Sequence, residues 1–274
     1  MSRLFVFGLG YTGQVLASRL RGAGWHVVGT GRGGTIDFGD DDAVRRELTA
    51  ATHVLSSVPP VDGLDPVLER YVAGESARWL GYLSSTGVYG DAGGAWVDES
   101  APTGTGRRTA RAAADAAWLA IGARVFRLPG IYGPGRSALD RVAEGRAHRT
   151  GLAGQVFSRA HVDDIVTGVI AGFDGPPGAY NLADDFPASQ DAVVSFAAHL
   201  LGLPPPPLVA LADLPPMARG FYAENRRIAA GKAKRLLGWT PRYRDYRAGL
   251  RSVSAITSPT ITSPAPSIDS GAQR

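Results

Sequence analysis

Short runs of consecutive apolar residues alternate along the first half of the chain with longer stretches whose apolar residues recur at helical spacing. A short unbroken apolar run is typical of a strand that is buried on both faces of a sheet. The runs that predict strands are Leu4–Phe7, Trp25–Gly29, His53–Val58, Trp79–Ser84 and Arg124–Leu128. Helices are predicted after Tyr11, over Asp41–Leu48 with Asp40 as its cap, and over Thr109–Ala120. This alternation predicts an α/β fold with a doubly wound parallel sheet.

The pattern changes after Pro129, where glycines and prolines punctuate the chain and helices are predicted near Asp163–Ala171 and Ser189–Leu201. We therefore assign residues 1–128 to the sheet core, with 155–175 returning to it, and residues 129–250 mainly to a small substrate-binding part. From about Ser252 onward the chain is Ser, Thr, Pro and Ala with almost no large apolar residue. Such a composition predicts a disordered tail over 251–274.

A glycine motif lies between the first predicted strand and the first predicted helix. It reads Gly8-Leu9-Gly10-Tyr11-Thr12-Gly13, the G-x-G-x-x-G pattern. Gly8 permits a tight turn, Gly10 lets a pyrophosphate approach the backbone, and Gly13 lets the helix pack on the strand. The free N–H groups of the helix that starts near Tyr11 face the phosphates. In this setting the motif predicts a dinucleotide-binding Rossmann core rather than an ordinary glycine-rich turn.

The end of the second predicted strand bears on the choice of cofactor. An NAD site usually places an acidic residue there, on the ribose hydroxyls. This chain has Gly29-Thr30-Gly31-Arg32 instead. A guanidinium at Arg32, with Thr30 as a second donor, suits the 2′-phosphate of NADP. We therefore predict NADP, with NAD as the second choice and a merely solvated Arg32 as the alternative.

Composition narrows the class of protein further. The 274 residues include no cysteine, which excludes disulfides, thiolate nucleophiles and cysteine-ligated metals. The formal net charge is +4, and the arginines are spread along the chain, so nucleic acid is a weak expectation. No unbroken apolar stretch reaches the ~18 residues of a membrane helix, and the start lacks a cleavage-like sequence. We expect a soluble, cytoplasmic protein with no membrane or nucleic-acid partner.

Several segments, taken together, resemble the extended short-chain dehydrogenase/reductase superfamily, in its NAD-dependent epimerase/dehydratase branch. Besides the glycine motif they are Leu83-Ser84-Ser85-Thr86-Gly87-Val88-Tyr89-Gly90, Arg127 to Gly135 (RLPGIYGPG), Arg159 to Asp164 (RAHVDD), Tyr180 to Asp185 (YNLADD) and Leu236 to Pro241 (LLGWTP). They occur in the matching order from about Leu4 to Leu250. The resemblance implies a nicotinamide cofactor and suggests a homodimer formed through helices that flank the sheet, where the small residues of Thr109–Ala120 would allow close packing.

The resemblance also implies roles for individual residues. Ser85 stands where the family keeps its catalytic hydroxyl, and Asp37 and Phe38 would flank the adenine. Ser57 and Val58 would line the nicotinamide side, and Pro129 to Ile131 would contact the nicotinamide ribose and carboxamide. Residues of these motifs could instead have purely structural roles. Ser85 could form hydrogen bonds with backbone groups at the end of its strand, and Asp163 is a plausible helix N-cap. His161 is expected to be structural rather than a metal ligand, because no second His lies at ligand spacing, and no metal site is predicted.

The family's catalytic Tyr-x-x-x-Lys pair is missing. None of the nine tyrosines has a lysine four residues later, and the register places Arg107 in the tyrosine slot and Arg111 in the lysine slot. Arg111 keeps the positive charge and can donate to the ribose, so it stays a catalytic candidate. Arg107 cannot exchange a proton, because a guanidinium stays protonated in proteins. Candidate substitutes for the tyrosine are Tyr89, Tyr132, Tyr82 and Asp98, of which Tyr132 is included in the predicted site. Tyrosines in these motifs are, however, more often packing or loop residues.

Two functions follow. The first is an NADP-dependent oxidoreductase or epimerase/dehydratase-like enzyme that acts on a small polar substrate, such as a sugar or nucleotide-sugar. Arg127, Arg136 and Arg159 are candidate anion contacts for it, although surface pairing explains lone arginines equally well. The alternative is a catalytically silent NADP-binding protein with a redox-sensing or regulatory role, which the absent Tyr/Lys pair supports. Both would bind NADPH, and only the first would consume it. A third alternative, a chain with this fold that binds no cofactor, is disfavoured by the intact glycine motif.

Overall fold

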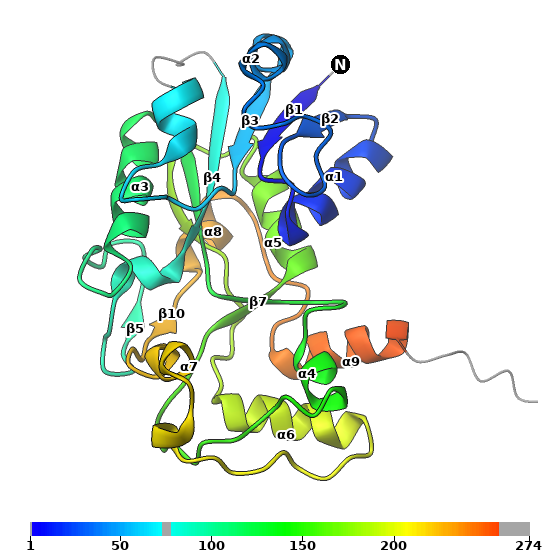
Figure 1. Cartoon of the computed structure of the whole chain (residues 1–274), viewed down its shortest axis with the longest axis vertical. Coiled ribbons are helices and arrows are strands. Elements are labelled where there is room, and N and C mark those ends of the chain that lie inside the picture. Colours follow the sequence, from blue (N-terminus) through cyan, green and yellow to red (C-terminus); the bar gives the residue numbers. More distant parts are fainter. Residues whose placement is uncertain (1, 73–77, 258–274) are drawn as a thin grey trace, which may run out of the picture.

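In the computed structural model, which describes residues 2–72 and 78–257, six parallel strands form one twisted sheet (Figure 1). Their spatial order is β2-β1-β3-β4-β6-β9. The strands are β1 (Arg3–Phe7), β2 (His26–Gly29), β3 (His53–Ser56), β4 (Trp79–Ser85), β6 (Arg124–Leu128) and β9 (Gly178–Asn181). The strand order reverses on either side of β1, and ligands of such sheets bind outside the carboxyl ends of the strands at this switch point.

Helices cover both faces of this sheet and bury the alternate side chains of each strand. On one face, α1 (Tyr11–Gly22) and α5 (Val162–Ala171) pack on Leu4 and Val6 of β1. On the other face, α2 (Asp41–Ala50), the π-helical turn η1 (Leu68–Val72) and α3 (Thr109–Ala120) cover Phe5 and Phe7. The two clusters explain why the strand sequences are continuously apolar, as a parallel sheet buried on both sides requires.

A smaller part lies beyond the carboxyl edge of the sheet (Figure 1). The third apolar cluster of the protein lies in this part and includes Tyr132 and Leu250. Three helices supply most of its residues. They are α4 (Ala138–Ala143), α6 (Gln190–Leu200) and α9 (Tyr246–Thr257). The remaining elements are η2 (Thr86–Tyr89), β5 (Trp96–Val97), β7 (Gly130–Tyr132), β8 (Arg159–His161), η3 (Leu211–Asp213), α7 (Pro216–Phe221), β10 (Arg227–Ile228) and α8 (Gly231–Leu236). Two short parallel pairs, β7 with β8 and β5 with β10, complete the connection between the two parts.

The predicted elements are confirmed, with three corrections. The sixth strand of the sheet, Gly178–Asn181, lies in the range assigned to the substrate-binding part. The tail predicted from residue 251 begins too early, because α9 continues to Thr257 and its amphipathic turn buries Val253; residues 258–274 lie outside the described residues. His161 rather than Asp163 caps α5, since its Nδ1 accepts the Asp163 backbone N–H.

Within the described ranges, no helix meets the length and apolarity that a membrane span requires.

Candidate functional site

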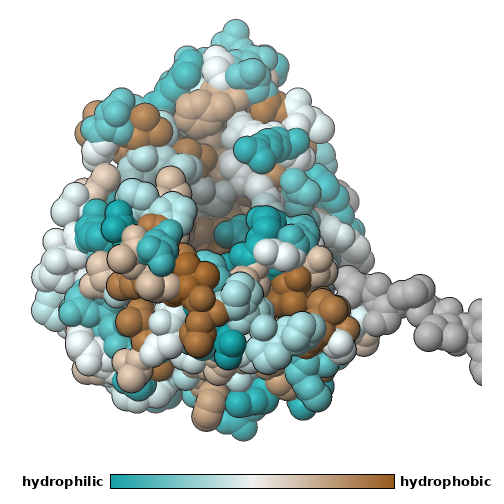
Figure 2. All heavy atoms as spheres, turned by 60° about the horizontal axis from the view of Figure 1, so that its bottom comes forward, coloured by the Kyte–Doolittle hydropathy of each residue, from teal (hydrophilic) through white to brown (hydrophobic). Residues whose placement is uncertain are grey.

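A cleft of about 940 Å³ lies between the carboxyl edge of the sheet and the smaller part, and it is visible as the hollow in Figure 2. One wall comes from the glycine motif and the end of β3. The floor comes from the ends of β4 and β6 and from the start of α3. The far wall comes from the segments around α4, β8 and α7. The cleft therefore joins the predicted cofactor residues and the predicted substrate part in one cavity.

The glycine motif adopts the geometry that a phosphate loop needs. Gly8 has a φ of +85°, and a Cβ added there would lie 2.7 Å from the Ser57 Oγ, which itself donates to the Gly8 carbonyl at 2.5 Å. Gly10 is the N-cap residue of α1 and offers no side-chain cap. A Cβ at Gly10 would meet no atom within 4 Å, so its face toward the cleft is open. The first N–H groups of α1 are left for an anionic ligand, and Gly10, Tyr11, Thr12 and Gly13 all line the cleft.

The residues after β2 differ in exposure: Thr30 is buried, whereas Arg32 and Asp37 are exposed. Thr30 is 1% exposed, and its Oγ1 accepts the backbone N–H of Gly8 at 3.2 Å. The hydroxyl thus supports the glycine loop from beneath, and its predicted contact with a 2′-phosphate stays a prediction. Arg32 is exposed, and no hydrogen bond or ion pair engages its guanidinium within the described part of the chain. Asp37 is also exposed and accepts from the Gly39 N–H, while Phe38 packs edge-on against Tyr71.

The predicted nicotinamide side is mostly assembled. Ser57, Ser85, Pro129 and Ile131 line the cleft. Ser85 Oγ accepts the backbone N–H of Gly87 at 3.1 Å, which leaves its own O–H free to donate to a ligand. Val58 instead packs against the apolar cluster beneath α2. Val58 is not among the described residues that line the cleft, so its predicted contact is not supported.

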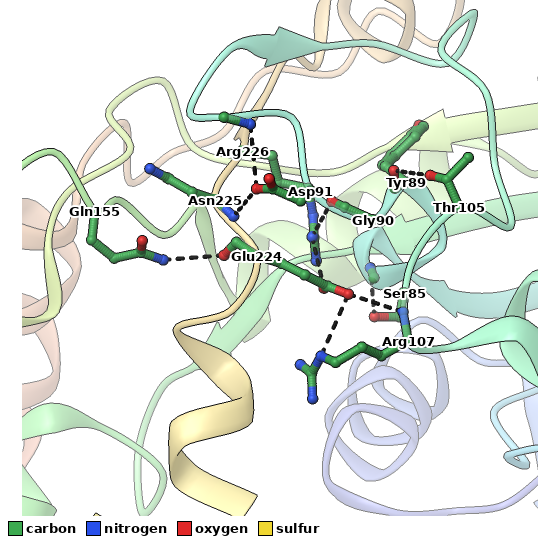
Figure 3. A network of polar contacts seen from close by, with 12 residues as sticks. Ser85, Tyr89, Gly90, Asp91, Thr105, Arg107, Gln155, Glu224, Asn225 and Arg226 are labelled. Atoms are coloured by element: carbon green, nitrogen blue, oxygen red, sulfur yellow. Dashed lines mark hydrogen bonds and ion pairs between the residues drawn. The ribbon is translucent and has the colours of Figure 1, made fainter. Parts of the chain in front are cut away.

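Both arginines of the Tyr/Lys register line the same cleft. Arg111 donates from Nη1 to the Tyr82 hydroxyl at 2.7 Å. Figure 3 shows Arg107 held against Glu224, which accepts from the Arg107 backbone N–H at 3.0 Å and lies 3.5 Å from its Nε. Glu224 also accepts from Arg226 at 2.9 Å. These hydrogen bonds and positive charges hold the Glu224 pKa below its usual value despite desolvation, so the carboxylate stays ionised and cannot donate a proton.

A buried polar network lies directly beneath the end of β4, next to Ser85. Asp115 of α3 accepts from Ser84 at 2.6 Å and binds Arg127 of β6 through both carboxylate oxygens. Arg127 donates in turn to the Tyr89 hydroxyl at 3.0 Å, and Tyr89 donates to Asn181 at 2.8 Å. All five side chains are buried. Arg127 therefore serves the fold rather than a substrate.

The predicted substitutes for the catalytic tyrosine are placed away from the cleft. Tyr89 and Tyr82 are engaged in the contacts just described, and burial raises the pKa of each to about 12. Tyr132 is 7% exposed, its hydroxyl has no hydrogen-bond partner and faces Gly249 of α9, and burial raises its pKa far above the usual range. None of the three lines the cleft in the described part of the chain. Asp98 is hydrogen-bonded to Ser100. The assignment of Tyr132 as a catalytic residue is thus not supported by its position.

The far wall carries a buried guanidinium. Arg159 is 8% exposed, and its Nη1 donates to the backbone carbonyls of Phe157 and Ala188, each at 2.8 Å. Its Nη2 donates to Gln190 Oε1 at 3.1 Å. No carboxylate lies within ion-pair distance of Arg159 in residues 2–72 and 78–257. Burial lowers its pKa to about 10, which still leaves it charged at neutral pH.

Sequence reasoning missed several residues of the cleft. They are Glu224, His148, Gln190, Tyr222 and the apolar side chains of α7. Most of them stand in short irregular segments where no periodic pattern or motif marks them. The proline pair Pro215-Pro216, which opens α7, was the one local signal that a helix begins there.

The chain was compared with family models, with curated proteins and with solved structures. No family model matches the chain. It is 26% identical over 240 residues to the protein YeeZ of Escherichia coli K12, covering 75% of this chain and 86% of YeeZ. It is 31% identical over 137 residues to the 3-diazoavenalumate denitrifying reductase of a Streptomyces species, covering 46% of this chain. That match spans only 45% of the reductase.

Solved structures resemble the chain over nearly its whole length. MoeE5 in complex with UDP-glucose and NAD is 21% identical with a TM-score of 0.71, covering 93% of this chain and 98% of MoeE5. The human epimerase family protein SDR39U1 with NADPH is 16% identical with a TM-score of 0.72, covering 92% and 99%. The chain therefore shares the fold of these two proteins, which is the fold that the resemblance implied.

A conserved protein of unknown function from Silicibacter pomeroyi is more similar. It is 41% identical, with a TM-score of 0.83, and the match covers 93% of this chain and 99% of that protein. The chain belongs to the same family as this Silicibacter protein.

Proposed function

We propose that the protein is an NADP-dependent oxidoreductase or epimerase/dehydratase-like enzyme that acts on a small anionic substrate. The observation that carries the proposal is the open, uncapped N-terminus of α1 at Gly10, which shares one cleft with Ser85 and with Arg159. The solved structures with this fold include complexes with NAD and with NADPH, which supports a nicotinamide nucleotide in this cleft.

The residues present fit such a nucleotide. The N–H groups at Tyr11, Thr12 and Gly13 would hold the pyrophosphate, and Arg32 would meet a 2′-phosphate. Ser57, Pro129 and Ile131 would line the nicotinamide side. A bound nicotinamide would supply or accept a hydride at this place.

Ser85 and Arg111 act on the substrate side of this arrangement. The Ser85 hydroxyl donates to the substrate oxygen, and the Arg111 charge stabilises negative charge that develops there. The proton has to come from a group outside the missing Tyr/Lys pair. His148 and Tyr222 line the cleft and carry exchangeable protons. We therefore expect His148→Gln or Tyr222→Phe to lower turnover by about 10²-fold or more while NADPH binding stays unchanged.

Binding of the nucleotide tests the first half of the proposal. Titration with NADPH should raise the melting temperature and change the tryptophan fluorescence. Arg111→Ala should weaken this binding, because the Arg111 guanidinium would also donate to the nicotinamide ribose. No response to millimolar NADPH or NADP⁺ would refute the cofactor assignment.

A second candidate is a silent NADP-binding protein that reports redox state through a partner. The observation in its favour is Arg107, which occupies the tyrosine slot and is held there by Glu224. A screen of small carbonyl and hydroxyl compounds with NADPH or NADP⁺ separates the two candidates. Turnover of any compound supports the enzyme, while tight binding without turnover supports the silent protein.

A further inference from the structure

The side of the cleft opposite the glycine motif carries an apolar surface that is left exposed by the residues the structure describes. Its residues belong to α7 and to the segment before β8, and they are Val156, Phe157, Pro215, Met217, Ala218 and Phe221. Met217 is 82% exposed and Phe221 is 52% exposed. Apolar side chains gather beside the hollow in Figure 2. Exposed apolar groups at the wall of a cavity mark a ligand-binding surface more often than scattered ones do.

This surface is held in place by polar contacts that follow α7 directly. Glu224 accepts from the Arg107 N–H, its own carbonyl accepts from Gln155 at 3.1 Å, and the Asn225 N–H donates to Asp91 at 2.7 Å (Figure 3). Glu224 is 9% exposed, so these bonds are largely shielded from water. The segment that follows α7 is therefore anchored to the loops that contain Asp91, Arg107 and Gln155.

Positive charge adjoins the apolar surface. The Arg159 guanidinium lies 6.0 Å from the ring centre of Phe157, and that ring packs edge-on against Tyr222 at 5.6 Å. Arg141 also lines the cleft, and neither arginine has an ion-pair partner among the residues that the structure describes. By contrast, Glu224 already neutralises part of the charge of Arg107 and Arg226. An anion that enters the far end of the cleft would thus meet two arginines that hold no ion pair in the described residues, beside an apolar wall.

We infer that the substrate is a carboxylate with an apolar body, an aromatic or acyl acid, whose apolar part packs on Met217 and Phe221 while its carboxylate meets Arg141 and Arg159. This inference rests on the proposed function and narrows its substrate class. A sugar or nucleotide-sugar presents several hydroxyl groups, and each needs a hydrogen-bond partner when it is buried. The six apolar side chains of this surface provide none, so such hydroxyls would find partners only at the polar groups elsewhere in the cleft, such as Gln190 and Tyr222. The apolar side chains gain free energy instead by covering an aromatic ring or an alkyl chain.

The test uses the full chain loaded with NADPH and measures binding by calorimetry. The probes are trans-cinnamate and octanoate as apolar carboxylates, cinnamamide as a neutral analogue and UDP-glucose as a nucleotide-sugar. We expect at least one carboxylate to bind more tightly than UDP-glucose, and cinnamamide to bind about tenfold more weakly than cinnamate. Tighter binding of UDP-glucose, or no binding of either carboxylate at millimolar concentration, would overturn the inference.

Variants locate the site. Phe221→Ser should weaken carboxylate binding about tenfold, because it removes apolar surface that the ligand covers. Arg141→Met should have an effect of similar size. Leu236→Ser is the matched control: Leu236 is also 52% exposed but lies on α8, away from the cleft, so binding should not change. Equal binding by Phe221→Ser and the unmodified protein would contradict the placement. NADPH titration of the same samples reports the proposed function separately, and carboxylate binding is also measured on the unloaded chain.

Discussion

The two ends of the cleft are lined by different kinds of group, backbone at one end and side chains at the other. At the cofactor end, backbone N–H groups of α1 and the glycines around Gly10 form the surface, and regular elements hold them in place. At the far end, side chains from short segments form the surface, and Arg159 is buried there with no ion pair among the described residues. Backbone groups bind phosphate with little dependence on side-chain identity, so the first end can serve any dinucleotide. Under the proposed function the second end would select the substrate, and its buried charge makes it sensitive to single substitutions.

The largest effect on stability is expected at the buried Asp115–Arg127 pair, which lies beneath both ends of the cleft. Asp115→Ala removes the bidentate partner of Arg127, which is 3% exposed, and leaves a buried guanidinium without compensation. We expect the free energy of unfolding to fall by about 3–5 kcal/mol. Urea unfolding measures this loss. The double variant Asp115→Ala with Arg127→Met should cost less than the sum of the two single variants, because no charge is stranded. A loss below about 1 kcal/mol would show that the Asp115–Arg127 pair contributes little to the stability of the fold.

The pH dependence of stability should distinguish the far end from the cofactor end. Asp184 is 3% exposed, and burial raises its pKa to about 8, against an ordinary value near 4. Between about pH 4 and pH 8 the folded protein therefore keeps a proton that the unfolded chain has released. The resulting stability is fully present below pH 4 and is lost as the pH rises through 8, by about 1 kcal/mol per unit.

The Asp184→Asn variant isolates this contribution. It should lack the decline, so the difference in unfolding free energy between the variant and the unmodified protein should grow from pH 5 to pH 8. Subtraction removes the effect of His53 and His161, whose pKa values are lowered by burial in both proteins. A pH-independent difference would mean that Asp184 is ionised in the folded protein at neutral pH.

The cofactor end should tolerate a substitution structurally while losing its ligand. A Cβ at Gly10 meets nothing within 4 Å, so Gly10→Val should fold normally. The added side chain would occupy the space that a pyrophosphate needs, and we expect about 10- to 100-fold weaker NADPH binding. Gly22→Ala, at the other end of α1 and equally open, is the control and should bind NADPH normally. Unchanged binding by Gly10→Val would place the nucleotide elsewhere.

The smallest expected effect concerns the choice between NADP and NAD. Arg32→Asp replaces an exposed guanidinium with the acid that an NAD site uses, and the preference should shift by about tenfold or more toward NAD. Competitive titration with the two nucleotides measures the ratio. If the unmodified protein binds both equally, Arg32 does not read the 2′-phosphate.

Local signals were sufficient for the sheet core. The apolar runs that formed β1, β4 and β6 were marked by their own composition, and the Ala-rich pattern gave α3 its observed bounds of Thr109–Ala120. The strand β9 was missed because Gly178–Asn181 is a short segment that becomes a strand only by pairing with β6. The extent of α9 was missed because its last turns are rich in serine and threonine, and Val253 is buried only by packing against the third cluster.

The sequence by itself determined the parallel sheet, the glycine loop and the loss of the Tyr-x-x-x-Lys pair, because each depends on residues that are close together along the chain. The tertiary structure alone decided which side chains share the cleft. It placed Thr30 beneath the loop and Tyr132 against α9, and it brought Glu224 to Arg107 across 117 positions of sequence. Such contacts depend on how whole elements pack, and the pattern of residues along a single element carries no information about the side chains that it will meet.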